Sequence, residues 1–211
     1  MTTDVLALAR SLRIIPVVEI EDAGRAVRLA ETLTEAGLPI MEVTMRTPAA
    51  LPAIAAIAEA LPDFAIGAGT VLSTTNLKDA AAAGARFAVS PGFTPTLSNA
   101  AAQYGLPVVP GAATPAEVLA AVECGHRFLK FFPAEQLGGV PVLKAFAAPF
   151  APLGILFMPT GGVRPATLRD YLDLPNVAAV GGTWIAERDV ITAGDFDRIG
   201  DTAGRAITAL N

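Results

Sequence analysis

The chain has 211 residues, of which 53% are hydrophobic, and it carries a net charge of −5. The acidic balance and the lack of basic runs argue against a nucleic-acid partner. No apolar run reaches the roughly 18 residues that cross a bilayer, so we expect no membrane partner either. A single cysteine and a single histidine exclude a disulfide framework and leave no Cys/His zinc site, so we expect neither metal nor cofactor. The start of the sequence lacks the features of a signal peptide, and a cytoplasmic location is expected.

Short runs typical of strands alternate with longer, alanine-rich runs typical of helices. The segment 2–12 predicts a helix that precedes this alternation. Strands are predicted at 14–18, 39–45, 64–69, 86–90, 106–110, 127–132, 154–159 and 177–182. Helices are predicted, among others, at 23–37, 47–61, 76–85 and 114–125. Helices are expected to begin at the Thr-Pro pairs 47–48, 94–95 and 114–115, with threonine as N-cap and proline in the first turn.

This order of elements predicts the fold. The predicted strands are continuously apolar, as expected of parallel strands that are covered on both faces. Eight strand–helix units predict one closed (β/α)8 barrel, or TIM barrel, an α/β fold in which residues 1–211 form a single domain. The helix at 2–12 would cover the closed end. An open, doubly wound sheet is the alternative, but no G-x-G-x-x-G motif opens its first unit. In a barrel, functional side chains lie at the C-terminal ends of the strands.

The predicted strand 127–132 carries a lysine inside an apolar run. Lys130 shares a face with Phe128 and Phe132, because side chains alternate along a strand. One interpretation is that its stem packs on the rings while the ammonium group reaches water. The apolar residues that follow favour a head group that faces the barrel axis. There, desolvation would favour the neutral amine, which is a nucleophile toward carbonyl carbon.

Polar side chains also end the second and third strands. Glu42, Thr44 and Arg46 share one face of the strand 39–45 and its end, so we expect them to point together into the barrel mouth. A Glu42–Arg46 pair that neutralises both charges is the alternative, since buried charges are usually paired. The third strand ends in glycines followed by Thr70, which suits close approach of a ligand to the backbone.

The seventh and eighth strands end in paired glycines. They stand at 161–162 and 181–182, and Thr183 comes directly after the second pair. In barrels these two loops often hold a phosphate through backbone N–H groups. The alternative is that the glycines only make the turns. His126, in a turn before the sixth strand, is expected to be exposed and structural, and Cys124 to end the preceding helix.

Six motifs together resemble those of one family. They are EVTMRT (42–47), GAGTVL (67–72), SPG (90–92), KFFPAE (130–135), PTGGV (159–163) and GGTW (181–184), in this order. They resemble the 2-keto-3-deoxy-6-phosphogluconate (KDPG) aldolases over nearly the whole chain. The resemblance implies a (β/α)8 barrel, a homotrimer and a class I, Schiff-base lyase of the Entner–Doudoroff route. Such an enzyme cleaves the phosphorylated keto-deoxy acid reversibly to pyruvate and glyceraldehyde 3-phosphate. Many relatives also cleave 4-hydroxy-2-oxoglutarate, to pyruvate and glyoxylate.

The resemblance also implies roles for individual residues. Lys130 would form the Schiff base and Glu42 would be the acid/base. The residues it implies in substrate binding are Arg46, Thr70, Pro91, Phe132, Gly161, Gly162, Gly182 and Thr183. Of these, Arg46 and Thr70 would bind the carboxylate, and the three glycines with Thr183 would hold the phosphate. Thr183 stands where the family has serine, and the hydroxyl group is retained.

Three other functions are left open. The sister aldolase for the galactonate-derived substrate differs only in the configuration at C4. A phosphosugar isomerase or epimerase on the same barrel would use Glu42 as a base but give Lys130 no covalent role. A non-catalytic phosphosugar sensor would explain neither residue.

Overall fold

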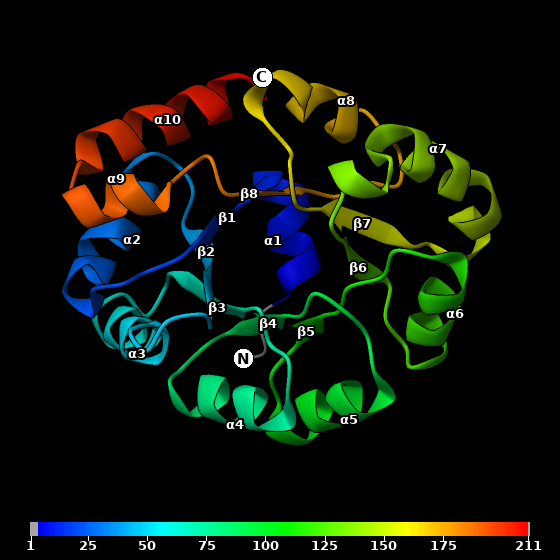
Figure 1. Cartoon of the computed structure of the whole chain (residues 1–211), viewed down its shortest axis with the longest axis horizontal. Helices are drawn as coiled ribbons and strands as arrows, with labels where there is room; N and C mark the ends of the chain where they lie inside the picture. Colours follow the sequence, from blue (N-terminus) through cyan, green and yellow to red (C-terminus); the bar gives the residue numbers. More distant parts are fainter. Residues whose placement is uncertain (1–3, 211) are drawn as a thin grey trace.

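The computed structural model describes residues 4–210, in which helices surround a ring of parallel strands (Figure 1). The strands are β1 (Ile14–Val18), β2 (Ile40–Thr44), β3 (Ala65–Gly69), β4 (Phe87–Val89), β5 (Val108–Val109), β6 (Phe128–Phe131), β7 (Leu156–Pro159) and β8 (Val180–Gly182). The helices are α1 (Val5–Leu12), α2 (Ala26–Glu35), α3 (Ala50–Ala60), α4 (Thr74–Ala82), α5 (Pro95–Tyr104), α6 (Pro115–Glu123), α7 (Gly139–Phe150), α8 (Leu168–Leu172), α9 (Arg188–Ala193) and α10 (Phe196–Thr208). In this part of the chain, no helix combines the length and the apolar character needed to span a membrane.

The strands close into a barrel. Six of them pair in parallel in the order β5-β4-β3-β2-β1-β8, and β6 pairs with β7. Single bridges join the two groups, from Gly111 to Lys130 on one side and from Phe157 to Val177 and Thr160 to Gly181 on the other. The predicted (β/α)8 barrel is therefore confirmed, and the open doubly wound alternative is wrong because these bridges link the β5 side to β6 and the β7 side to β8 and so close the ring.

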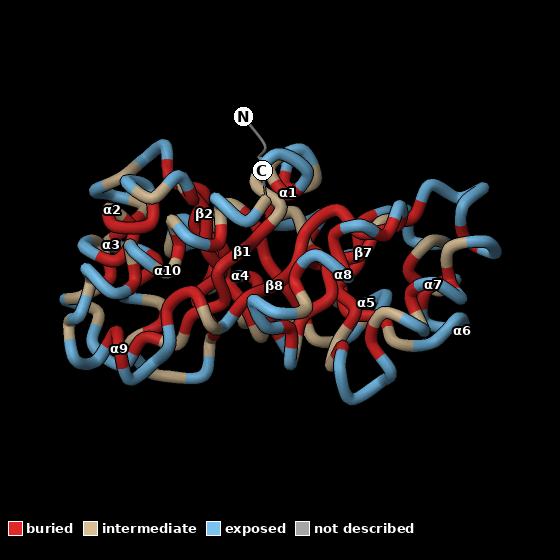
Figure 2. Tube along the Cα trace, turned by 90° about the horizontal axis from the view of Figure 1, so that it is seen from above, coloured by how far each residue is buried: buried red, intermediate tan, exposed pale blue. Residues whose placement is uncertain are grey.

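Apolar side chains fill two separate layers. One lies between the strands and the surrounding helices, and the other fills the inside of the barrel. Helix α1 contributes Val5 and Ala9 to the inner layer, so it covers the end of the barrel at which the strands begin. Figure 2 shows α1 at one end of the molecule, over the buried strands. This agrees with the expected capping helix for residues 5–12, while residues 2 and 3 of the expectation lie outside the described part.

Two of the three expected Thr-Pro helix starts are confirmed. Thr94 and Thr114 each accept a hydrogen bond from the backbone three residues on, and proline follows in the first turn. The expectation for Thr47 is wrong, because α3 begins only at Ala50. The Thr47 hydroxyl donates instead to the carbonyl of Ile20, so it joins two loops at the same end of the barrel. A side chain used in that way is not available as an N-cap.

Candidate active site

Glu42 and Lys130 meet inside the barrel. Glu42 lies on β2 and Lys130 on β6, and Lys130 Nζ donates to Glu42 Oε1 over 3.0 Å. Glu42 is fully buried and Lys130 is 5% exposed. Both side chains therefore face inward, as the alternation along each strand predicts. The ion-pair partner of Glu42 in the described residues is Lys130, so the alternative Glu42–Arg46 pair is wrong.

The hydrogen-bonding capacity of the Glu42–Lys130 pair is only partly used. Glu42 Oε2 is buried and has no hydrogen-bond partner within residues 4–210. Lys130 Nζ lies 5.4 Å from the centre of the Phe132 ring, in a cation–π arrangement. Buried polar atoms usually have partners, so an unpaired carboxylate oxygen beside an amine indicates a place for a water or a ligand. The contact also lets a proton pass directly from the ammonium group to the carboxylate.

Arg46 lies at the mouth of the barrel. Its Nε donates to Thr70 Oγ1 over 3.2 Å, and its Nη1 lies 3.7 Å from Glu19 Oε2. Thr44 lies on the same face of β2 as Glu42, as expected of residues two apart on a strand. Thr44 is buried, and its hydroxyl donates to the carbonyl of Val18 on the neighbouring strand. Arg46 follows the end of β2, where a turn has replaced the strand and its alternation.

Thr70 has an unusual backbone. Its φ of 57° lies in the left-handed region, which costs free energy for a residue with a Cβ. Gly69, just before it, makes room for the site: a Cβ there would lie 3.2 Å from the carboxyl carbon of Glu42. Strained backbone of this kind is concentrated at functional sites, and here it presents the Thr70 hydroxyl to Arg46.

The glycine pair just after β7 lies beside the pair that ends β8, because Thr160 and Gly181 form a bridge. Gly161 and Gly162 have φ values of 97° and 81°, which glycine adopts at no steric cost. Within residues 4–210, the backbone N–H groups of Gly161, Gly162 and Thr183 donate no hydrogen bond. Gly162 and Thr183 are also exposed. Free backbone N–H groups at neighbouring strand ends are donors that an anion can use.

Phe132 lies next to the lysine, and Pro91 is linked to it through Gly111. Phe132 follows β6 directly, and Pro91 lies in the loop after β4. The backbone of that loop packs on Gly111, whose N–H donates to the carbonyl of Gly92, and Gly111 in turn forms a bridge with Lys130. Of the ten residues predicted for the site, Glu42 lies in the middle of β2, and the other nine lie near or just beyond the C-terminal ends of strands.

Two acidic residues at this end of the barrel were not assigned from the sequence. Glu19 directly follows β1 and pairs with Arg188 over 3.0 Å as well as with Arg46. Glu135 ends the KFFPAE motif, and its Oε1 accepts a hydrogen bond from the hydroxyl of Tyr171 over 2.5 Å. The place of Glu19, one residue past a predicted strand, was a usable signal. Nothing in the sequence pattern pointed to Tyr171.

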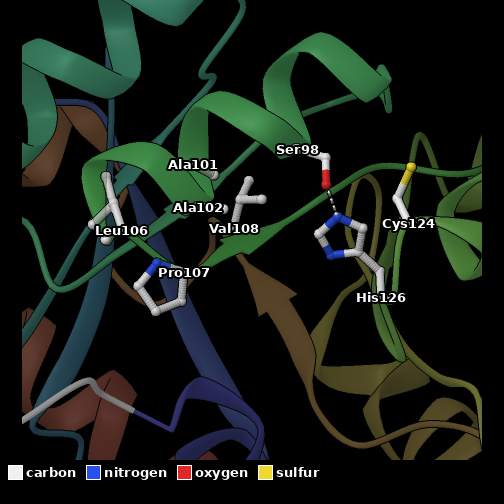
Figure 3. A pocket seen from close by; sticks show the side chains of 10 residues that line it. Ser98, Ala101, Ala102, Leu106, Pro107, Val108, Cys124 and His126 are labelled. Atoms are coloured by element: carbon white, nitrogen blue, oxygen red, sulfur yellow. Dashed lines mark hydrogen bonds between the residues drawn. The ribbon is translucent and has the colours of Figure 1, made fainter.

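His126 lies at the opposite end of the strands, beside β5 and before β6. It is half-buried, not exposed as expected, because its ring packs edge-on against Phe93 and its Nε2 lies 2.8 Å from Ser98 Oγ. It lines a pocket of about 420 Å³ together with α5 residues and Cys124 (Figure 3). Burial lowers the pKa of His126, and the charge of Arg127 lowers it further. Cys124 follows α6, as expected, and is exposed.

Known proteins share this barrel and these motifs. Residues 5–202 match the family model for KDPG and KHG aldolase. The 2-dehydro-3-deoxy-phosphogluconate aldolase of Pseudoalteromonas atlantica is 45% identical over 194 residues, which are 92% of this chain and 89% of that protein. The KHG/KDPG aldolase of Escherichia coli K12 is 43% identical over 194 residues, 92% of this chain and 90% of that protein.

A solved structure extends the similarity to three dimensions. It is the KDPG aldolase of Legionella pneumophila, in which pyruvate was captured at low pH as a covalent carbinolamine intermediate. It superimposes with a TM-score of 0.93 at 38% identity and covers 98% of this chain and 99% of its own. A family model over almost the whole length, relatives above 40% identity and the same barrel lead to one conclusion. The chain belongs to the KDPG and KHG aldolase family.

Proposed function

We propose that this chain is a class I aldolase that cleaves KDPG to pyruvate and glyceraldehyde 3-phosphate, and also 4-hydroxy-2-oxoglutarate to pyruvate and glyoxylate. The observation that carries the proposal is the buried Lys130–Glu42 contact with its partnerless oxygen. An isomerase or epimerase needs the carboxylate but gives no role to an amine 3.0 Å away. The names of the similar proteins from P. atlantica and E. coli support the same substrates.

The first half of the reaction uses the amine. Lys130 gives a proton to Glu42 across their hydrogen bond and becomes neutral. The amine attacks the C2 ketone of the substrate and forms a carbinolamine. Protonation of its hydroxyl by Glu42 lets water leave, and an iminium remains. That cation withdraws electrons from the neighbouring C3–C4 bond.

The second half uses the carboxylate as a base. Glu42 takes the proton of the C4 hydroxyl, directly or through a water at its partnerless Oε2. The C3–C4 bond breaks, its electrons pass into the iminium to give an enamine, and the aldehyde leaves. Glu42 then returns the proton to C3. Water attacks the resulting iminium, and pyruvate and the free amine are released.

The remaining residues hold the two ends of the substrate. Arg46 and Thr70, already hydrogen-bonded to each other, bind the carboxylate. Phe132 and Pro91 pack beside the reacting carbons. The phosphate sits on the free N–H groups of Gly161, Gly162 and Thr183, with Gly182 close behind. These four residues are called the phosphate cradle below.

Trapping with borohydride tests the covalent step. Pyruvate and borohydride together should reduce the iminium and add one pyruvate-derived group per chain, measured by intact mass. Peptide mapping should place it on Lys130 and not on Lys78 or Lys144, which are exposed. An adduct on another lysine, or none at all, contradicts the Schiff-base mechanism.

The resemblance to the family also leads us to propose a homotrimer. Sedimentation equilibrium should give a mass about three times that of the 21.6 kDa chain. A monomer or dimer at micromolar concentration would contradict this assembly without affecting the chemistry.

A further inference from the structure

A carboxylate lies beside the phosphate cradle, which at first sight opposes anion binding. Glu135 is exposed, and its Cγ lies 2.6 Å from the point where a Cβ on Gly162 would stand. The side chain therefore packs directly on the bare Cα of Gly162. A carboxylate that swung outward from this position would repel a bound phosphate at short range.

A buried tyrosine holds this carboxylate. Tyr171, on α8, is fully buried and donates its hydroxyl to Glu135 Oε1 over 2.5 Å. Burial raises the pKa of Tyr171, and the hydrogen bond and charge of Glu135 raise it further, so the hydroxyl keeps its proton and donates. The bare Cα of Gly139 makes room for the hydroxyl, since a Cβ there would lie 2.6 Å from it.

The backbone of the same segment holds the cradle loop. Glu135 N donates to the carbonyl of Gly161 over 3.1 Å, and Ala134 N donates to the carbonyl of Thr160 over 2.8 Å. These bonds occupy the carbonyls of the glycine loop and leave the N–H groups of Gly161 and Gly162 for a ligand. A movement of Glu135 would therefore disturb both the charge near the cradle and its backbone.

We propose that Tyr171 is a positioning residue for phosphorylated substrate: it anchors the Glu135 carboxylate away from the anion and keeps the loop after β6 in place against the cradle. The inference rests on the proposed phosphate cradle. Tyr171 lies behind the loop and reaches the substrate only through Glu135.

Tyr171→Phe tests the anchor, because it keeps the ring in the core and removes only the hydroxyl. We expect KM for KDPG to rise roughly tenfold, since a released carboxylate then faces the phosphate at short range. The concentration of pyruvate that gives half-maximal borohydride trapping should stay within about twofold of the parent, because pyruvate has no phosphate. Tyr104→Phe, at the exposed end of α5, is the matched control and should change neither value.

The double variant Tyr171→Phe/Glu135→Gln separates positioning from packing. The amide has the shape of the carboxylate without its charge, so KM for KDPG should return to within about twofold of the parent. If Tyr171 acted only by packing, the second substitution would rescue nothing. The inference is overturned if Tyr171→Phe leaves KM unchanged, impairs pyruvate trapping equally, or is not rescued by Glu135→Gln.

A separate pair of variants tests the cradle itself. Gly162→Asp and Gly162→Asn place similar bulk beside Glu135, but only the first adds a charge. If these two differ in KM for KDPG while Tyr171→Phe has no effect, the cradle stands and the role of Tyr171 is wrong. If the two variants do not differ in KM for KDPG, the phosphate does not bind at the cradle. That result would contradict the phosphate site of the proposed function and not the role of Tyr171 in particular.

Discussion

The two ends of the barrel differ in whether their polar atoms have hydrogen-bond partners within the protein. At the end where the strands finish, Glu42 Oε2 and the N–H groups of three cradle residues have no partner within residues 4–210. At the end where they begin, α1 covers the inner apolar layer, and nearby His126 and Ser98 bond to each other. Asn176 Oδ1 is an exception to this difference, because it is also buried without a partner in the described chain. The amide nitrogen of Asn176 does donate, to the carbonyl of Leu143.

This difference separates stability from function in one fold. Leaving a buried polar atom unpaired costs about 1–3 kcal/mol, so such atoms are retained where a ligand or water completes them. At the closed end, Asn176 Oδ1 apart, the buried side-chain polar atoms of residues 4–210 make their hydrogen bonds within the protein. Substitutions at the open end should therefore change kinetics most, and substitutions at the closed end should change only stability.

The largest effect is expected for Lys130→Met. Without the amine no Schiff base forms, so borohydride trapping should vanish and cleavage should fall below detection. Glu42 is left buried without its partner, which should lower the free energy of unfolding by about 3–5 kcal/mol. Adding Glu42→Gln should restore part of that loss, measured by urea unfolding. Cleavage at the parent rate would show that Lys130 is structural.

The next largest effect on activity is expected for Glu42→Gln alone. The amide keeps the shape but cannot take a proton, so kcat for cleavage should fall by roughly 10²–10⁴-fold. Pyruvate binding should change much less than kcat. A kcat within a few-fold of the parent would mean that the base lies elsewhere.

Gly162→Asp should weaken binding of the substrate's phosphate group without affecting the chemistry at Lys130. We expect KM for KDPG to rise at least about tenfold over Gly162→Asn, because the new carboxylate repels the anion. Asparagine tolerates the positive φ at this position about as well as aspartate, so backbone strain is matched. The two variants should not differ with 4-hydroxy-2-oxoglutarate. Equal losses on both substrates would indicate damage to the barrel instead.

The smallest effect is expected at the closed end, for His126→Gln. Because burial lowers the pKa of His126, the unfolded chain binds a proton at higher pH than the folded chain. The parent should therefore lose stability as the pH falls below about 6.5, and the variant should lose less over the same range. Urea unfolding at pH 7.5 and 5.5 measures this, with kcat unchanged. Identical pH dependence in both proteins would show that His126 titrates equally in the two states.

Much of the fold and site followed from local patterns. Continuous apolar runs predicted buried parallel strands, and alternation within β2 and β6 predicted that Glu42 and Lys130 face inward. The prediction failed where a strand ended or a side chain had a distant partner. Thr47, expected as an N-cap, bonds instead to the carbonyl of Ile20 just after β1, and no local pattern encodes that partner. The assignment of residues 1–211 to one domain, and the roles of the site residues, stay predictions.

The sequence by itself therefore determined which strand carries each site residue and which face of that strand the side chain occupies. Both follow from local composition and from the two-residue period of a strand. Only the tertiary structure decided which residues meet. Closure of the barrel brings Glu42 to Lys130, 88 positions apart, and the packing of α8 against the loop after β6 brings Tyr171 to Glu135. Contacts between distant segments depend on the register and tilt of every strand between them. No local spacing contains that information.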